Sequence, residues 1–205
     1  ITVLCSVLIS IDTGAIFKNS HAMSLALCMY GDPILRKKAE EVTEITGDIH
    51  ELADQMIETM HAEQGVGLAA EQVGRAERMF VIDISPEGDV DDEGRRENPD
   101  VAMPMVLINP EITGHSDEVQ HGPEGCLSFP GIFANVERWY EIDAEYTNLA
   151  GDRVQVHAKG LLARAIQHEL DHLNGILLVD RMSHVKKVAL SGKLKRLVKQ
   201  TKQTL

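Results

Sequence analysis

The sequence predicts one domain that combines helices with antiparallel β-strands. Apolar residues recur with helical spacing over residues 49–62, and the stretch around residues 167–172 is apolar nearly all round, as in a buried helix. Between these helices lie short β-prone segments separated by turn residues, and the turn at residues 148–152 marks a hairpin. A chain of 205 residues is long enough to bury a full hydrophobic core.

The first predicted elements are a capped turn and an amphipathic helix. Asp32 can cap a short helix whose first position is Pro33, and the helix at residues 49–62 comes next. Taken alone, the glycine-rich segment 65–74 favours a tight turn between a helix and a strand. The strands that follow are predicted at residues 79–84, 106–109, 111–119, 133–138, 141–146 and 154–158.

Charge is distributed unevenly along the chain. The formal net charge is -12, which disfavours nucleic-acid binding over the whole surface. Residues 85–104 are acidic and rich in Gly and Pro, and we expect a mobile, solvated surface loop without chemistry. Residues 184–205 are basic, and we expect a partly exposed C-terminal helix. Its broken apolar stripe consists of Val185, Val188, Ala189, Leu194, Leu197 and Val198.

Cysteine content and hydropathy indicate a cytoplasmic protein. Three scattered cysteines are too few for a disulfide framework, which fits a reducing compartment. No segment is long enough to span a bilayer. We expect residues 1–22 to be an N-terminal extension outside the core, before a start at Met23; a signal-sequence remnant is the alternative.

The central motif is HExxH, formed by residues 168–172. On a helix, His168 and His172 lie four residues apart on one face and can bind one metal ion. Glu169 lies beside that face, which suits a general base acting on metal-bound water. The alternative is two histidines on a solvated helix face. The apolar surroundings favour the metal, because buried polar groups need partners.

The third ligand separates the classes of metal hydrolase. One large protease group extends the motif to HExxHxxGxxH, and this chain matches as far as Gly175 but has Leu178 at the last position. Other zinc proteases use a downstream Glu, and after Gly175 the only acidic residue is Asp180. Cys126 is therefore the strongest remaining candidate, as a thiolate. Two imidazoles and a thiolate leave a fourth position open, as catalysis requires.

Three motifs together resemble the peptide deformylase family. They are residues 65–72 (GVGLAAEQ), 124–128 (EGCLS) and 167–172 (QHELDH), and residues 30–36 resemble the start of that family. The resemblance covers roughly residues 23–182. It implies an α+β fold with antiparallel β-sheets around a central HExxH helix, followed by a C-terminal helix. It also implies a catalytic domain at residues 23–183 that removes the formyl group from N-formylmethionine on newly made polypeptides.

The resemblance also implies a role for individual residues. Cys126, His168 and His172 would hold the metal, and Glu169 would move the proton between water and the leaving amine. The remaining roles are oxyanion donors (Gln72 and the backbone N–H of Leu127), backbone contacts to the peptide (Gly67 and Gly125), the methionine pocket (Val66, Leu161 and Ala165) and an ion pair bracing the cysteine segment (Glu124 and Arg138).

This chain departs from the family pattern at two positions. Arg164 falls at a pocket position that is usually apolar, and Phe133 stands where some relatives carry a basic residue. The family favours one Fe²⁺ per chain as cofactor, with Zn²⁺ as the alternative and Ni²⁺ or Co²⁺ as substitutes; a soft-to-borderline ligand set suits all of them. The partners it suggests are N-formylmethionyl nascent peptides and the ribosome, the latter through residues 184–205.

Two other functions compete with this interpretation. An HExxH metallopeptidase would share the helix, but it does not explain Cys126 or the segment 65–72. A non-catalytic binding protein of the same fold would be expected to have lost a ligand or the catalytic Glu, and here every such position is filled. The sequence does not predict an oligomeric state.

Overall fold

The computed structural model describes residues 24–204, so the extension predicted at residues 1–22 lies outside the described part. Its helices are α1 (Gly47–Ala62), α2 (Gly160–Leu173), α3 (Leu178–Arg181) and α4 (His184–Thr204), with short 3₁₀ helices η1 (Pro33–Arg36) and η2 (Ala70–Val73). Its strands are β1 (Gly67–Ala69), β2 (Met79–Ile82), β3 (Met105–His115), β4 (Val119–Glu124), β5 (Ala134–Trp139), β6 (Glu141–Thr147) and β7 (Arg153–Lys159).

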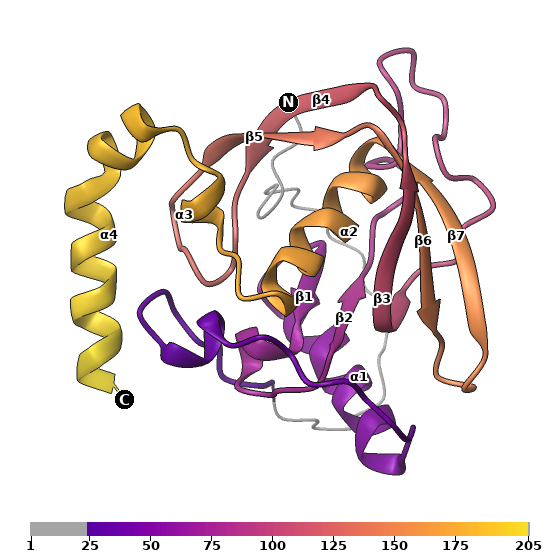
Figure 1. Ribbon diagram of the computed structural model, residues 1–205, viewed down its shortest axis with the longest axis horizontal. Helices are drawn as coiled ribbons and strands as arrows, with labels where there is room; N and C mark the ends of the chain where they lie inside the picture. The colour runs from indigo at the N-terminus through magenta and orange to yellow at the C-terminus, as the bar shows by residue number, and fades with distance from the viewer. Residues whose placement is uncertain (1–23, 205) are drawn as a thin grey trace, which may run out of the picture.

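The strands form two antiparallel sheets. One has five strands in the order β1-β2-β3-β6-β7, and the other pairs β4 with β5 (Figure 1). The β6–β7 hairpin turns at Asn148, whose backbone N–H donates to the carbonyl of Asp152 at 3.0 Å, as the sequence predicts. The predicted α+β class with antiparallel sheets and a C-terminal helix is confirmed.

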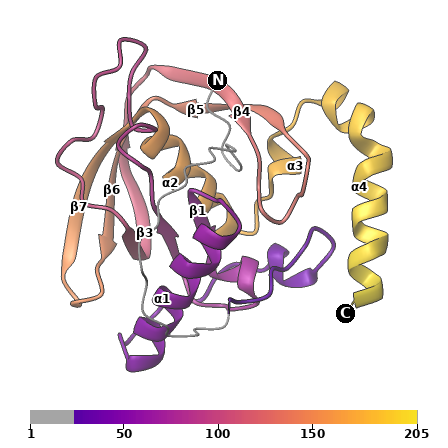
Figure 2. The same ribbon diagram turned by 180° about the vertical axis from the view of Figure 1, so that it is seen from behind.

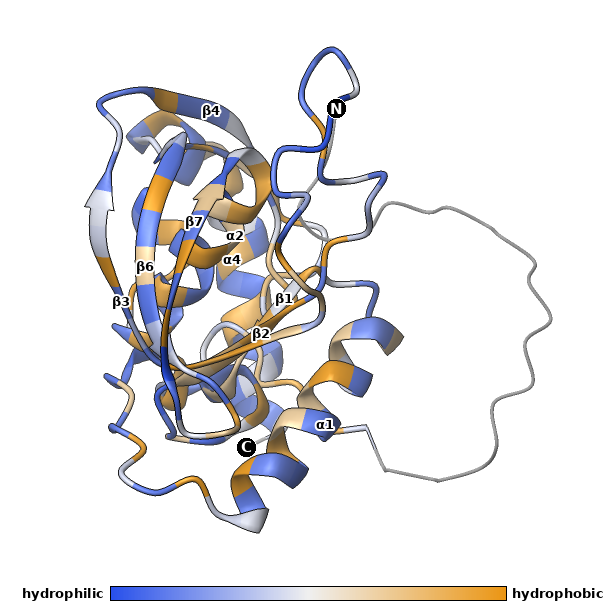
Figure 3. Ribbon diagram, turned by 90° about the vertical axis from the view of Figure 1, so that its right-hand side faces the viewer, coloured by the Kyte–Doolittle hydropathy of each residue, from blue (hydrophilic) through white to orange (hydrophobic). Residues whose placement is uncertain are grey.

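Helices cover both faces of the five-stranded sheet, and β2 shows why. All four residues of β2 are buried, because side chains alternate between the two faces of a strand. Met79 and Val81 pack with α1 residues in one core cluster. Phe80 and Ile82 pack with α2 residues in another. In Figure 2, α1 lies on the face of the five-stranded sheet that is turned away from α2. Figure 3 shows α1 orange on one side and blue on the other, as expected for an amphipathic helix.

Helix α2 lies between the two sheets. It contacts β1, β2 and β7 of the larger sheet and β5 of the smaller one. Twelve of its fourteen residues are buried. A third apolar cluster joins β5 to α3 and α4 and includes Val136, Leu178 and Leu194. The helix that carries residues 168–172 is therefore enclosed by sheet on both sides, which holds its side chains in fixed positions.

Several strand boundaries differ from the prediction. The segments expected at residues 106–109 and 111–119 form one strand, β3, which is irregular near Asn109, a residue with φ of 49°. The segment expected to be only a turn contains β1, which pairs with β2. β4 includes Gly122 and Pro123, residues that weaken any β-strand pattern.

The acidic loop at residues 85–104 is largely exposed, as expected, but it is anchored to the domain by buried residues. Asp89 and Asn98 are buried, and the backbone N–H of Asn98 donates to Asp89 Oδ2 at 3.0 Å. Asn98 also exchanges two hydrogen bonds with the backbone of Lys159, at 3.2 and 2.9 Å. The carboxylate of Glu97 occupies the space where a Cβ on Gly160 would lie. The loop therefore rests on the first residue of α2.

The basic C-terminal helix is confirmed, but its packed face differs from the predicted stripe. α4 is yellow and lies at one side of the molecule in Figure 1. Leu194 and Thr201 are buried, and Thr201 Oγ1 donates to the carbonyl of Tyr30 at 3.1 Å. Val185 and Val188 are exposed. Within residues 24–204, no helix has both the length and the apolar character that crossing a membrane requires.

Candidate active site

Three possible metal ligands meet beside α2. Cys126 follows β4, and His168 and His172 lie one turn apart on α2. The ligand atoms of these three buried residues all lie within 4.8 Å of one another. Cys126 Sγ lies 3.3 Å from His172 Nε2. The predicted trio is therefore brought together by segments 42 residues apart in the chain.

The chemistry of this trio fits a divalent metal ion. One sulfur and two imidazole nitrogens form a donor set that suits Zn²⁺ or Fe²⁺. Burial, and then the neighbouring His168, holds the pKa of His172 well below its ordinary value, so this imidazole is neutral and its lone pair is free to bind metal. Burial alone would also lower the pKa of His168, but Cys126 and Glu124 raise it well above the ordinary value. A proton must therefore leave His168 when an ion binds.

Glu124 fixes the orientation of His168. Its carboxylate is fully buried and accepts from His168 Nδ1 at 2.9 Å, so the other ring nitrogen faces the ligand trio. Arg138 donates to both carboxylate oxygens, at 2.9 and 3.0 Å, and the expected Glu124–Arg138 pair is confirmed. Burial opposes ionisation, yet the bonds from His168 and Arg138 hold the pKa of Glu124 below its usual range.

Glu169 is a buried carboxylate beside the trio. Its Oε2 has no hydrogen-bond partner among residues 24–204, and burial raises its pKa to about 7. Gly67 makes room for it, because a Cβ at that position would lie 2.9 Å from Glu169 Cδ and 3.0 Å from Cγ. This requirement for glycine at residue 67 is additional to the peptide contact that the resemblance implies.

Gln72 is held with its amide directed at the site. Its Oε1 accepts from the backbone N–H of Ala69 at 2.9 Å. Its Nε2 donates to Cys126 Sγ at 3.4 Å and to Ser128 Oγ at 3.2 Å. Ser128 belongs to the motif at residues 124–128, but no role was predicted for it from the sequence. The neighbouring Glu71 is also buried; burial raises its pKa to about 8, so it adds little charge at neutral pH.

Most of the predicted site residues line a small cavity of about 20 Å³. Its lining includes eight predicted residues: Val66, Gly67, Gln72, Gly125, Cys126, Leu127, His168 and Glu169. His172 lies behind them as the third member of the trio. Leu161 lines a different cavity, and Ala165 is fully buried in the core, so the methionine pocket is the least well supported part of the prediction.

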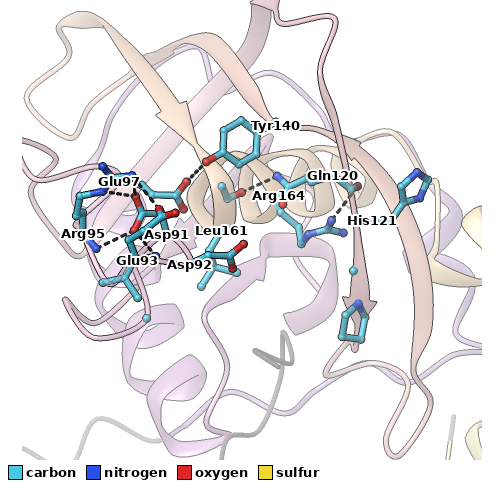
Figure 4. A pocket seen from close by; sticks show the side chains of 15 residues that line it. Asp91, Asp92, Glu93, Arg95, Glu97, Gln120, His121, Tyr140, Leu161 and Arg164 are labelled. Carbon is cyan, nitrogen blue, oxygen red and sulfur yellow. Dashed lines mark hydrogen bonds and ion pairs between the residues drawn. The ribbon is translucent and has the colours of Figure 1, made fainter.

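The larger cavity lies between the acidic loop and β4 (Figure 4). It has a volume of about 480 Å³ and combines loop carboxylates with Leu161 and Arg164 from α2. Size alone would favour it over the smaller cavity as the active site. The three candidate metal ligands and Glu169, whose Oε2 has no hydrogen-bond partner in the described part of the chain, lie at the smaller cavity, and we place the chemistry there because those groups can carry it.

Comparison with known proteins identifies the family. The model of the polypeptide deformylase family matches residues 24–188. The chain belongs to the peptide deformylase family. It is 44% identical over 172 residues to a peptide deformylase of Endomicrobium trichonymphae. The alignment covers 84% of this chain and 94% of that protein.

Solved peptide deformylases share the fold. The crystal structure of the Thermotoga maritima protein matches with a TM-score of 0.69 and 40% identity, over 78% of this chain and 99% of that one. The Ehrlichia chaffeensis structure matches with a TM-score of 0.76 and 36% identity, over 89% and 100%. This peptide deformylase is therefore a hydrolase that removes N-formyl groups from nascent peptides, and the metallopeptidase and binding-protein alternatives are set aside.

Gly67→Ala tests the close approach of β1 to Glu169. The new Cβ would push the carboxylate aside, and we expect turnover of a formylated peptide to fall about 10²-fold, the usual cost of a misplaced catalytic group. Bound metal should be unchanged. Gly47→Ala is the matched control, since a Cβ there meets nothing within 4 Å. Wild-type turnover in Gly67→Ala would show that Glu169 needs no such space.

Proposed function

We propose that Cys126, His168 and His172 hold one divalent metal ion in this peptide deformylase, with Glu169 as the proton-transfer group. The observation that carries this proposal is the meeting of three buried donor atoms beside a buried carboxylate with an unpartnered oxygen. The same four residues are those that the family resemblance assigns to these roles.

The reaction is hydrolysis of the formyl C–N bond, which yields formate and a free amine. The ion would supply Lewis acidity to the formyl carbonyl and to the attacking water. Glu169 takes a proton from that water and later delivers it to the departing nitrogen. Burial has already raised the pKa of Glu169 to about 7, so its carboxylate can both accept and release a proton near neutral pH.

The groups around Glu169 would bind the substrate. Gln72 Nε2 and the backbone N–H of Leu127 donate hydrogen bonds to the formyl oxygen as negative charge develops on it. Gln72 already points at Cys126, which supports this role. Gly67 and Gly125 line the same cavity and offer backbone groups to an extended peptide. We retain Val66, Leu161 and Ala165 as the proposed methionine pocket.

The domain boundaries and the identity of the metal are also proposals. Residues 23–183 form the catalytic domain, residues 1–22 an extension and residues 184–205 a basic appendage. Fe²⁺ is the proposed working ion, because it accepts a higher coordination number than Zn²⁺ at the same ligands. A cytoplasmic location stays a prediction from the sequence.

Glu169→Gln should remove the chemistry and leave the metal. The amide keeps the size of the side chain but cannot accept the proton, so we expect turnover to fall at least about 10²-fold. Metal content, measured on the same preparation, should stay near that of the wild type. If this variant retains normal turnover, Glu169 is not the proton-transfer group.

The metal proposal is tested by reconstituting the apoprotein with single metals. We expect the Fe²⁺ form, prepared without oxygen, to be the most active and to lose activity in air, because both Fe²⁺ and the Cys126 thiolate oxidise. Ni²⁺ or Co²⁺ forms should be active and longer lived. Deformylation rates paired with metal analysis decide the matter, and a Zn²⁺ form equal to the Fe²⁺ form would contradict the proposal.

The basic face of α4 is the proposed contact with ribosomal RNA. Lys195, Arg196 and Lys199 are exposed, so replacing all three with Gln should leave the helix packed while removing phosphate contacts. We expect weaker co-sedimentation with ribosomes at low salt and unchanged activity on short formyl peptides. A variant with Lys37→Gln and Lys38→Gln, exposed residues outside α4, is the control. Equal co-sedimentation of both variants and the wild type would exclude α4 as the contact.

A further inference from the structure

A buried arginine lies one turn before the first metal-ligating histidine. Arg164 is 5% exposed and stands four residues before His168 on α2. Its NH1 donates to Glu124 Oε1 at 2.8 Å and to the carbonyl of Val136 at 3.0 Å. Its NH2 donates to the carbonyl of Gln120 at 3.1 Å. Burial lowers the pKa of Arg164 and Glu124 opposes that effect, and a guanidinium keeps its charge at neutral pH.

Glycine on β4 provides the space for this side chain. A Cβ on Gly122 would lie 3.2 Å from Arg164 NH2 and 3.3 Å from its Cζ. Both contacts are tighter than side chains ordinarily make, so a Cβ at 122 would require the guanidinium to shift by a few tenths of an ångström. The chain therefore carries a matched pair, with a large cation on α2 and no side chain opposite on β4.

Glu124 has more donors than its orientation requires. Arg138 already binds both carboxylate oxygens, and His168 Nδ1 binds Oε2 at 2.9 Å. The bidentate Arg138 fork fixes the plane of the carboxylate without help. Arg164 adds a second cation to Oε1, so the difference it makes to Glu124 is mainly one of charge.

We propose that Arg164 is a positioning residue that acts through Glu124 on His168 and lowers the affinity of the site for its metal ion. This inference rests on the metal site proposed above. A carboxylate that accepts the Nδ1 proton of a histidine makes the other ring nitrogen a stronger ligand. A second guanidinium draws the negative charge of Glu124 away from His168, and its own positive charge also opposes a cation nearby. The site therefore binds its ion less tightly than one with an apolar residue at 164.

Three variants of Arg164 separate charge from shape. Arg164→Met keeps the apolar stem, Arg164→Gln keeps a hydrogen-bond donor without the charge, and Arg164→Lys keeps the charge without the fork. The measured quantity is the dissociation constant for Zn²⁺, obtained by competition with a chelator of known affinity. We expect the two neutral variants to bind Zn²⁺ about tenfold more tightly, at the lower end of effects caused by groups next to metal ligands. Arg164→Lys should stay within about twofold of the wild type.

The controls distinguish this proposal from the metal site on which it rests. Arg181 reaches α2 at Asp171 and makes no bond to Glu124, so Arg181→Leu should leave the Zn²⁺ dissociation constant unchanged. His172→Ala should weaken Zn²⁺ binding severely; if it does not, the metal site itself is wrong. If His172→Ala weakens binding as expected but all three Arg164 variants shift the constant alike, or the neutral ones weaken it or leave it unchanged, then Arg164 is only structural and the proposal is overturned.

Discussion

The Glu124 carboxylate is the constraint on which the active site depends. It is fully buried, and an isolated carboxylate in such a place would be too costly to keep charged. Arg138 and His168 hold it ionised, and it in turn fixes the ring of His168. The candidate metal ligands come from α2 and from the segment after β4, and this one side chain joins the two. Loss of Glu124 would remove the acceptor of Arg138 Nε and NH2 and leave His168 Nδ1 without its partner.

The buried charges continue along α2. Arg138 NH1 also donates to Asp171 Oδ2 at 2.7 Å, and Asp171 accepts from Arg181 Nε at 2.9 Å. A chain of alternating charge therefore runs from β4 through β5 and α2 to α3. Each charge in this network therefore has a partner of opposite sign. It places polar anchors on a helix whose apolar contacts are less specific in direction.

The sequence predicted that Cys126, His168 and His172 come together, and the structure brings them together. The four-residue spacing of His168 and His172 puts both on one helix face in any fold, and elimination then left Cys126. The elements missed are those without periodicity. β1 has three residues and begins with a glycine, and β4 contains Gly122 and Pro123, so neither has a β-strand pattern.

Sequence patterns also did not predict which individual polar side chains would pair. The acidic composition of residues 85–104 indicates solvation, yet Asp89 is buried because Asn98 and Arg96 donate to it, and pairing of this kind does not show in local composition. Arg164 departs from the family pattern, but its partners on β4 and β5 became visible only in the fold. The resemblance located these residues, and the packing gave them their surroundings.

The position of Glu97 has a consequence for how this chain can vary. Its carboxylate fills the place of a side chain at Gly160, the residue at which α2 begins with φ of 53°. The same carboxylate accepts from the hydroxyl of Tyr140, and negative charge is favoured at a helix N-terminus. The loop is therefore not a removable insertion. A shorter loop without Glu97 would uncover the start of the helix that carries the two candidate histidine ligands, so a change in this loop has to be matched by a change at residue 160.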